Sequence, residues 1–236
     1  MRQTRWLARG GFACATVLVL VGCGSGQEEM ARRVFESRVA RVSVNVERNE
    51  VHVFGSDQTS GAVIDRWTQS GDAYRELGEA QDGDRVDVVA SCERSGECRA
   101  RYDLALAKST LVDVAMQQGN LGLYHLGSEV RATVGQGSIV GKHITARHVE
   151  LGLGRGRIDV IMADRPELLV VRIDEGRVNL VMPPGRYRCE FDRFDEAIHL
   201  NGLDCHGRMA QGIRLELGKG AYVTFKSNVN YVGPTP

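Results

Sequence analysis

Four segments of twelve residues decide the fold: VDVAMQQGNLGL at 112–123, VRATVGQGSIVG at 130–141, VELGLGRGRIDV at 149–160 and LVVRIDEGRVNL at 169–180. Each has a glycine at its eighth position, and these glycines are 18, 19 and 20 residues apart in the chain. Positions one, three, five, ten and twelve are apolar in every segment, except that Gly141 occupies the last of them in the second segment. This alternation before and after the glycine predicts two half-buried strands in each repeat.

The step from the fifth to the tenth position is odd, so a straight strand would turn its second apolar set toward the wrong face. Something must reset the alternation between these positions. Glycine can adopt positive φ and can form a bulge or a corner there. We therefore expect Gly119, Gly137, Gly156 and Gly176 to mark the corner of each repeat.

A period near twenty residues with two short strands per period, and with no helical pattern, predicts an all-β protein built as a β-solenoid. Stacked repeats would join their apolar stripes into one continuous core of about six to seven turns. The alternative is a β-sandwich, because short strands at regular spacing also describe that fold. A sandwich would not require the same register in every repeat.

The pattern extends on both sides of the defining segments. Val42, Val44, Val46, Val51 and Val53 fit the same positions, with Asn49 in place of the glycine; asparagine also tolerates left-handed conformations. Further on, Ile213, Leu215, Leu217, Tyr222 and Thr224 fit around Gly220. We expect the repeat domain to cover residues 40–226, with two excursions at 55–100 and 186–212 and a loose tail at 227–236.

The first 22 residues have a basic start and an apolar run from Phe12 to Val21, which is typical of a secretory signal peptide. The run is shorter than a membrane span requires. Its end, Leu20-Val21-Gly22-Cys23, resembles the bacterial lipobox. The resemblance implies cleavage before Cys23 and a diacylglycerol on that cysteine, with residues 23–39 as a tether. Because residue 24 is glycine rather than aspartate, we expect an outer-membrane lipoprotein, facing the periplasm or the surface.

Six cysteines are present; Cys14 leaves with the signal peptide and Cys23 carries the lipid. The other four fall as one pair in each excursion, and the compartment is oxidising. We expect local disulfides, Cys92 with Cys98 and Cys189 with Cys205, because local pairing is the most economical of the three possible connectivities. The alternative is a metal site formed by Cys189, Cys205, His199 and His206, although zinc motifs usually have closer cysteines.

Charge and motif searches exclude several functions. The mature part carries 27 basic and 30 acidic residues, a balance that argues against nucleic acid as a partner. The sequence has no nucleophile elbow, zinc-protease motif, Walker loop or dinucleotide fingerprint. At the second position of the first three segments, Asp113, Arg131 and Glu150 would stack as a ladder of alternating charge on a solvated face.

One further column, whose orientation the pattern does not fix, has less ordinary chemistry. Six residues after the corner glycines stand His125, His143, Met162 and Met182 in consecutive repeats. Stacked strands lie about 4.8 Å apart, and imidazole with thioether suits copper. A corner at which half-exposed side chains merely stack would give the same column, so both interpretations stay open.

The repeated Gly-x-Leu/Ile/Val units at 119–121, 137–139, 156–158 and 176–178 resemble the bacterial "putative adhesin" family, related to the head domain of auto-transporter adhesins. Residues 180–187, with Met182-Pro183-Pro184-Gly185, are similar to that family's proline-glycine end of a repeat. Residues 104–110 resemble its entry segment, although Ala107 stands where proline is usual. The resemblance covers roughly residues 40–226 and implies a β-solenoid in the envelope, without catalytic residues.

These observations favour a lipid-anchored, non-enzymatic binding or structural module of the cell envelope. Apart from its lipid we expect no cofactor. The membrane would be one partner, and envelope proteins or polysaccharide could be others. Two alternatives stay open: a carbohydrate-active enzyme on a parallel β-helix, which needs carboxylates converging in a groove, and a metal-handling protein that uses the His/Met column.

Overall fold

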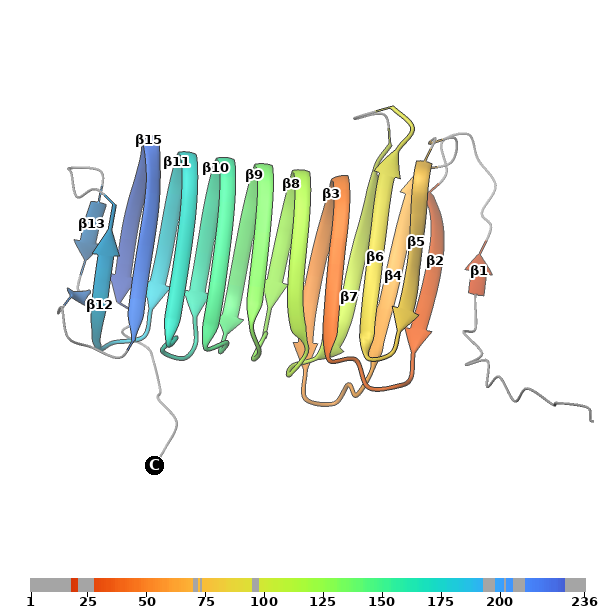
Figure 1. The fold of residues 1–236 in the computed structure, drawn as a ribbon, viewed down its shortest axis with the longest axis horizontal. Coiled ribbons are helices and arrows are strands. Elements are labelled where there is room, and N and C mark those ends of the chain that lie inside the picture. The colour runs from red at the N-terminus through yellow and green to blue at the C-terminus, as the bar shows by residue number, and fades with distance from the viewer. Residues whose placement is uncertain are drawn as a thin grey trace, which may run out of the picture.

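The computed structural model describes residues 18–20, 28–69, 72, 74–94, 98–192, 198–201, 203–205 and 211–227. The regular structure of these residues is all β (Figure 1). The strands are β1 (Leu18–Leu20), β2 (Glu28–Phe35), β3 (Arg41–Ser56), β4 (Ala62–Gln69), β5 (Tyr74–Asp82), β6 (Arg85–Cys92), β7 (Ala100–Ala107), β8 (Leu111–Tyr124), β9 (Val130–Ile144), β10 (His148–Met162), β11 (Leu168–Met182), β12 (Arg186–Phe191), β13 (Ile198–Asn201), β14 (Asp204–Cys205) and β15 (Gly212–Ser227).

Six long strands, β3, β8, β9, β10, β11 and β15, lie next to one another in that order and pair in parallel. Each contains both halves of one repeat, and Figure 1 shows them as a regular ladder along the long axis of the molecule. Val134, Leu153 and Ile173 are direct partners on neighbouring strands. The expected parallel pairing of residues about nineteen apart is therefore confirmed.

The core follows the apolar positions of both halves. Val134, Leu153 and Ile173 are each at most 3% exposed, and the positions after the corner, such as Ile158 and Val178, are fully buried. Residues of the two halves belong to one hydrophobic cluster that runs the length of the ladder. Stacking thus buries stripes that no single repeat could cover alone.

The four corner glycines have the backbone geometry that the alternation required. Gly119, Gly137, Gly156 and Gly176 have φ between 133° and 142°, a region that L side chains rarely adopt. A Cβ on Gly156 would also collide with the carbonyl oxygen of Gly137 on the neighbouring strand. Each corner therefore needs glycine twice, for its φ angle and for the close approach of the next backbone.

Asn49 aligns with Gly119, as the pattern predicts. It does not, however, adopt the left-handed conformation that was expected at this position. Its φ is not positive; its side-chain Oδ1 instead accepts a hydrogen bond of 2.9 Å from the backbone N–H of Ala100 on β7. Asparagine here fixes the adjoining strand rather than relieving a left-handed backbone.

The expected alignment around Gly220 is wrong by one residue. Gly220 lies opposite Glu175, and Ala221 lies opposite Gly176, because a bulge shifts the register after Ile173. The buried residues of the second half are consequently Ala221, Val223 and Phe225. Tyr222, which the pattern placed in the core, is 60% exposed.

The strands that extend the ladder at its two ends come from the expected excursions and, in the case of β7, from the residues directly after the first one. β6 pairs in parallel with the first half of β3, and β7 pairs with its second half. At the other end β12 and β13 pair in the same way with the two halves of β15. Each long strand forms one level of the ladder, and at each end two separate strands together form one further, divided level. Among the described residues there are thus six continuous and two divided levels, more than the six to seven turns that the repeats predicted.

Residues 28–35 also differ from the expected tether. They form β2, which pairs antiparallel with β4 over its whole length, and β4 pairs in turn with β7. Phe35 packs against the core, an apolar contact that the polar composition of the segment concealed. β1, which lies in the predicted signal peptide, pairs antiparallel with β2 in turn, so the described sheet includes residues from both the signal peptide and the tether.

A buried ion pair closes the core near β2, β4 and β5. The Glu79 carboxylate on β5 is 1% exposed and lies 2.7 Å from a guanidinium nitrogen of Arg66 on β4, with Arg33 of β2 at 3.6 Å. The hydroxyl of Tyr102 is also buried, and this burial raises its pKa above the usual value. Charges buried at this depth need partners, so these residues tie the β5–β6 hairpin to the β2–β4 layer.

Candidate functional site

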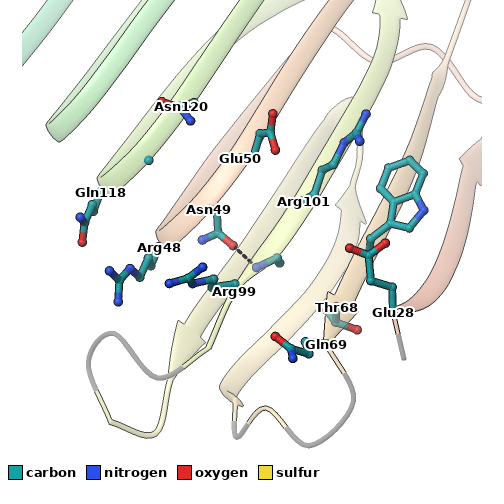
Figure 2. A pocket seen from close by; sticks show the side chains of 13 residues that line it. Glu28, Arg48, Asn49, Glu50, Thr68, Gln69, Arg99, Arg101, Gln118 and Asn120 are labelled. Atoms are coloured by element: carbon teal, nitrogen blue, oxygen red, sulfur yellow. Dashed lines mark hydrogen bonds between the residues drawn. The ribbon is translucent and has the colours of Figure 1, made fainter. Parts of the chain in front are cut away.

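We call the outward side chains of the strand halves that follow the corner the outer face. At one end of the ladder this face contains a groove. The groove has a volume of about 630 Å³ and lies where β2, β4, β7, β3 and β8 meet near their corners (Figure 2). It is lined by Glu28, Arg48, Asn49, Glu50, Trp67, Thr68, Gln69, Arg99, Ala100, Arg101, Gln118, Gly119 and Asn120. Guanidinium, amide and carboxylate groups dominate this lining, and one indole contributes an apolar surface.

Arg101 and Trp67 form one wall of the groove. The Arg101 guanidinium carbon lies 5.0 Å from the centre of the Trp67 ring, within the range of a cation–π contact. The same guanidinium donates to Asp103, at 3.0 Å to Oδ2 and 3.3 Å to Oδ1. This hydrogen bonding raises the pKa of Arg101 above its ordinary value. Arg101 is thereby held in one orientation before any ligand arrives.

Beside the groove, on β3, His52 lies between two carboxylates. Its Nδ1 is 3.0 Å from Oδ1 of Asp103, and its Nε2 is 3.3 Å from Oε1 of Glu50. Asp103 therefore contacts both Arg101 and His52, so one chain of polar contacts crosses β7 and β3. This chain orders the side chains between the groove and the rest of the outer face.

Two aromatic rings continue the site away from the corner. Phe54 on β3 and Tyr124 on β8 stack with their centroids 4.9 Å apart and their planes 12° apart, and His52 contacts each ring edge-on at 6.2 Å. A Cβ on Gly122 would lie 2.6 Å from the Tyr124 ring and 2.8 Å from His52. Glycine at this position thus makes room for the rings, and Phe54 remains 38% exposed.

The corner end of the groove carries two arginines. Arg48 precedes Asn49 in β3, and Arg99 precedes β7; Figure 2 shows both at the Asn49 end, with Arg101 and Glu28 toward the other end. The backbone of Arg99 is fixed by a hydrogen bond of 2.9 Å from its N–H to Asp72 Oδ2 and by one from the Tyr74 hydroxyl to its carbonyl. The side chains of Arg48 and Arg99 therefore both extend from ordered backbone.

Both expected disulfides are present. Cys92 is bonded to Cys98 in the connection between β6 and β7, and Cys189 on β12 is bonded to Cys205 on β14. Each bond lies in a divided end level of the ladder. The alternative metal site at the second pair would use His206, which is outside the described residues, and His199, which is exposed on β13.

The structure separates the His/Met column into two environments. His125 and His143 are exposed, both have φ of 55°, and their rings stack with centroids 5.0 Å apart. Met162 and Met182 are instead fully buried in the core. Met162 continues the alternation of β10, whereas an extra residue in β9 turns His143 outward and places Ile144 opposite Met162. Within the described part of the chain no three His, Cys, Asp or Glu side chains gather as metal ligands.

The charge ladder predicted from the repeats lies in register, with Asp113, Arg131 and Glu150 as direct partners on β8, β9 and β10. Arg172 extends it by donating to both Glu150 and Glu216, and these hydrogen bonds raise its pKa. Cys23, the expected lipidation site, is outside the described residues. No helix among the described residues is long and apolar enough to cross a membrane.

The groove itself was missed from the sequence. Half of the signal was available: Glu50 of the groove, and His52, Phe54 and Tyr124 of the adjoining outer face, occupy odd offsets from the corner, which the repeat pattern turns outward. The other half was not, since Trp67 and Arg101 belong to segments that carry no repeat. Only the pairing of β4 and β7 beside β3 brings these residues to the same place.

No family model matches the chain, and no curated protein matches it. Among solved structures it is similar to a "putative cell adhesion protein" from Clostridium sporogenes, with 14% identity and a TM-score of 0.47 over 86% of this chain and all of that one. It is also similar to a "putative adhesin" from Bacteroides fragilis, with 8% identity and a TM-score of 0.42 over 85% of this chain and 97% of that one.

Proposed function

We propose that this chain is a lipid-anchored β-solenoid of the bacterial cell envelope, which binds a partner without chemical conversion through its groove and the adjoining outer face. The single observation that carries the proposal is the continuous run of ordered polar and aromatic side chains from Trp67 through Arg101, Asp103 and His52 to the Phe54–Tyr124 stack. The parallel register of consecutive repeats supports the solenoid arrangement.

The contacts within the site favour binding. Arg101 is held by Asp103 and Trp67, and Glu50 faces His52, so these groups serve as fixed contact points. Rigid side chains lose little conformational entropy when a partner docks. The flat ladder behind them gives a surface on which an extended partner can lie, as expected for an adhesin-like module.

The anchor sets where this site would lie. If Cys23 carries the lipid, Glu28, which lines the groove, is the fifth residue after it. A fully extended chain spans at most about 3.6 Å per residue, so the groove would lie within roughly 18 Å of the membrane surface. Replacing Cys23 with serine should leave an unprocessed precursor without an acyl chain, which membrane fractionation and mass spectrometry of the N-terminus would show; normal processing would remove the anchor from the proposal.

The binding role is tested with the unlipidated domain, residues 24–236, sedimented with isolated cell envelopes. Phe54→Ser should reduce the bound fraction, because it removes half of the exposed aromatic stack. Tyr222→Ser is the matched control: it removes a more exposed aromatic ring from the same outer face at the far end of the ladder. Equal loss with both variants, or no loss with either, would contradict the assignment of binding to this site.

A further inference from the structure

One side of β2 is paired along its whole length with β4, whereas its other side pairs only with β1, at Met30–Arg32 (Figure 1). Among the described residues β1 is the last strand of the sheet in this direction. β1 belongs to the predicted signal peptide, so processing would remove it and leave backbone N–H and C=O groups of β2 unpaired. Such an edge is a template for another strand, and the pairing with β1 shows that an antiparallel strand fits there.

The charges of β2 are sorted by sign along the strand. Glu28 and Glu29 stand at its start, and Arg32 and Arg33 follow toward its end. A second copy of the same strand, running in the opposite direction, brings acidic residues beside basic ones. Opposite charges on directly facing residues favour antiparallel pairing, and like charges oppose it. The strand is therefore complementary to itself.

We propose that the free edge of β2 pairs with β2 of a second copy of this chain, antiparallel about a two-fold axis at Met30; this rests on removal of the signal peptide. Directly facing residues of a sheet point to the same side. Glu28, Met30 and Arg32 alternate onto one side, where Glu28 lines the groove and Met30 lies opposite Trp67. With the axis at Met30, Glu28 of each copy faces Arg32 of the other.

The other face of β2 does not offer an equivalent pairing. An axis at Ala31 would place Glu29 of one copy opposite Arg33 of the other. Arg33 is turned toward the core, however, where its Nε lies 3.6 Å from the Glu79 carboxylate, which is 1% exposed. Contact with Glu29 of a second copy would draw Arg33 away from this buried carboxylate, so the axis at Met30 is favoured.

Arg32 can take a second carboxylate without losing its present one. Its side chain is 53% exposed, and its Nε lies 3.3 Å from Oδ1 of Asp65 on β4. A guanidinium group has five N–H donors, and Arg172 in this chain already donates to Glu150 and Glu216 on its two neighbouring strands. Arg32 would bridge Asp65 and Glu28 of the second copy in the same way.

The test uses the full-length chain in isolated envelopes of the cells that express it, oxidised with copper phenanthroline and separated on non-reducing gels. Met30→Cys should form a disulfide-bonded dimer, because it faces itself across the axis and facing Cβ atoms lie about 4.5–5.5 Å apart. Val34→Cys is the matched control on the same strand, where Val34 is 36% exposed; its two copies would lie about 26 Å apart, at about 3.3 Å per residue. We expect at least about fivefold more dimer from Met30→Cys.

A second pair of variants does not depend on Met30. Glu28→Cys and Arg32→Cys should each give little dimer alone, since identical positions would lie about 13 Å apart, but should cross-link to each other when differently tagged copies are co-expressed. Glu28→Lys should lower the Met30→Cys dimer at least about threefold by placing like charges opposite each other. Glu29→Lys, which faces Ala31 in this register, should leave it unchanged.

Equal cross-linking of Met30→Cys and Val34→Cys would indicate random collision and would overturn the proposal. A cross-linked product that contains a different protein would also overturn it, as would equal loss of dimer with Glu28→Lys and Glu29→Lys. Mass spectrometry of the processed N-terminus tests the premise separately: retention of residues 18–20 would leave β1 on this edge and would refute pairing with a second copy. The envelope sedimentation of Phe54→Ser reports on the groove independently of these outcomes.

Discussion

Replacing Gly156 with alanine should lower the free energy of unfolding substantially, and the structure gives the reasons separately. The φ angle of Gly156 is 137°, and holding a side-chain-bearing residue in such a sparsely populated region costs about 1–3 kcal/mol. The new Cβ would also overlap the carbonyl oxygen of Gly137. Relieving such an overlap by shifting backbone costs about 1–3 kcal/mol more. We therefore expect a total loss of about 2–6 kcal/mol.

Gly152→Ala is the matched control, in the same strand and four residues away. Gly152 does not have positive φ, and a Cβ there would meet the side-chain hydroxyl of Thr133 at 3.4 Å, an ordinary contact. Because alanine reduces the freedom of the unfolded chain, this variant should gain about 0.4–1 kcal/mol. The two substitutions make the same chemical change and should have opposite signs.

Urea denaturation followed by far-ultraviolet circular dichroism measures both variants, with thermal unfolding as a second readout. A loss of 2 kcal/mol or more should lower the melting temperature of a chain of this size by at least about 4 °C. The reasoning would be refuted if Gly156→Ala and Gly152→Ala had the same effect, since φ and the approach of Gly137 would then not constrain the corner.

Three further outcomes follow from the packing and the charges. Leu153→Ala should lose about 2–5 kcal/mol of stability in the same denaturation assay, because the side chain is 3% exposed in the shared core; a loss below 1 kcal/mol would contradict that packing. Glu79→Ala should lose about 3–5 kcal/mol by leaving Arg66 half-buried without its partner, and Glu79→Ala combined with Arg66→Met should recover part of it. The Arg214 guanidinium lowers the pKa of the Glu190 carboxyl, so Arg214→Gln should raise that pKa in a carboxyl NMR titration. The ion pair stabilises the fold at pH values above the ordinary carboxyl pKa, and this contribution is lost as the pH falls through the lowered pKa. An unchanged titration would show that the pair does not form.

The sequence determined the repeated part of the fold because that part is written in local pattern. Alternating apolar residues specify which side of each strand is buried, and glycine at a fixed offset marks the corner, so β8, β9, β10 and β11 could be predicted with their register. Two positions failed within this scheme. An extra residue in β15 moved Tyr222 outward, and an extra residue in β9 moved His143 outward while Met162 stayed in the core. A single inserted residue reverses the face of everything that follows, and no local signal announced either insertion.

Only the tertiary structure decided the two ends and the groove. The alternation of β6 and β7 shows that one face of each is buried, but it does not show that together they form the level outside β3. Nor does it show that β15 pairs between β11 and β12. Three different segments contribute Trp67, Arg101 and Arg48, and no common repeat links these segments in the sequence. The three residues meet because β4, β7 and β3 pair side by side. Periodicity encodes the orientation of a side chain relative to its own strand, whereas the choice of neighbouring strand depends on contacts summed over the whole sheet.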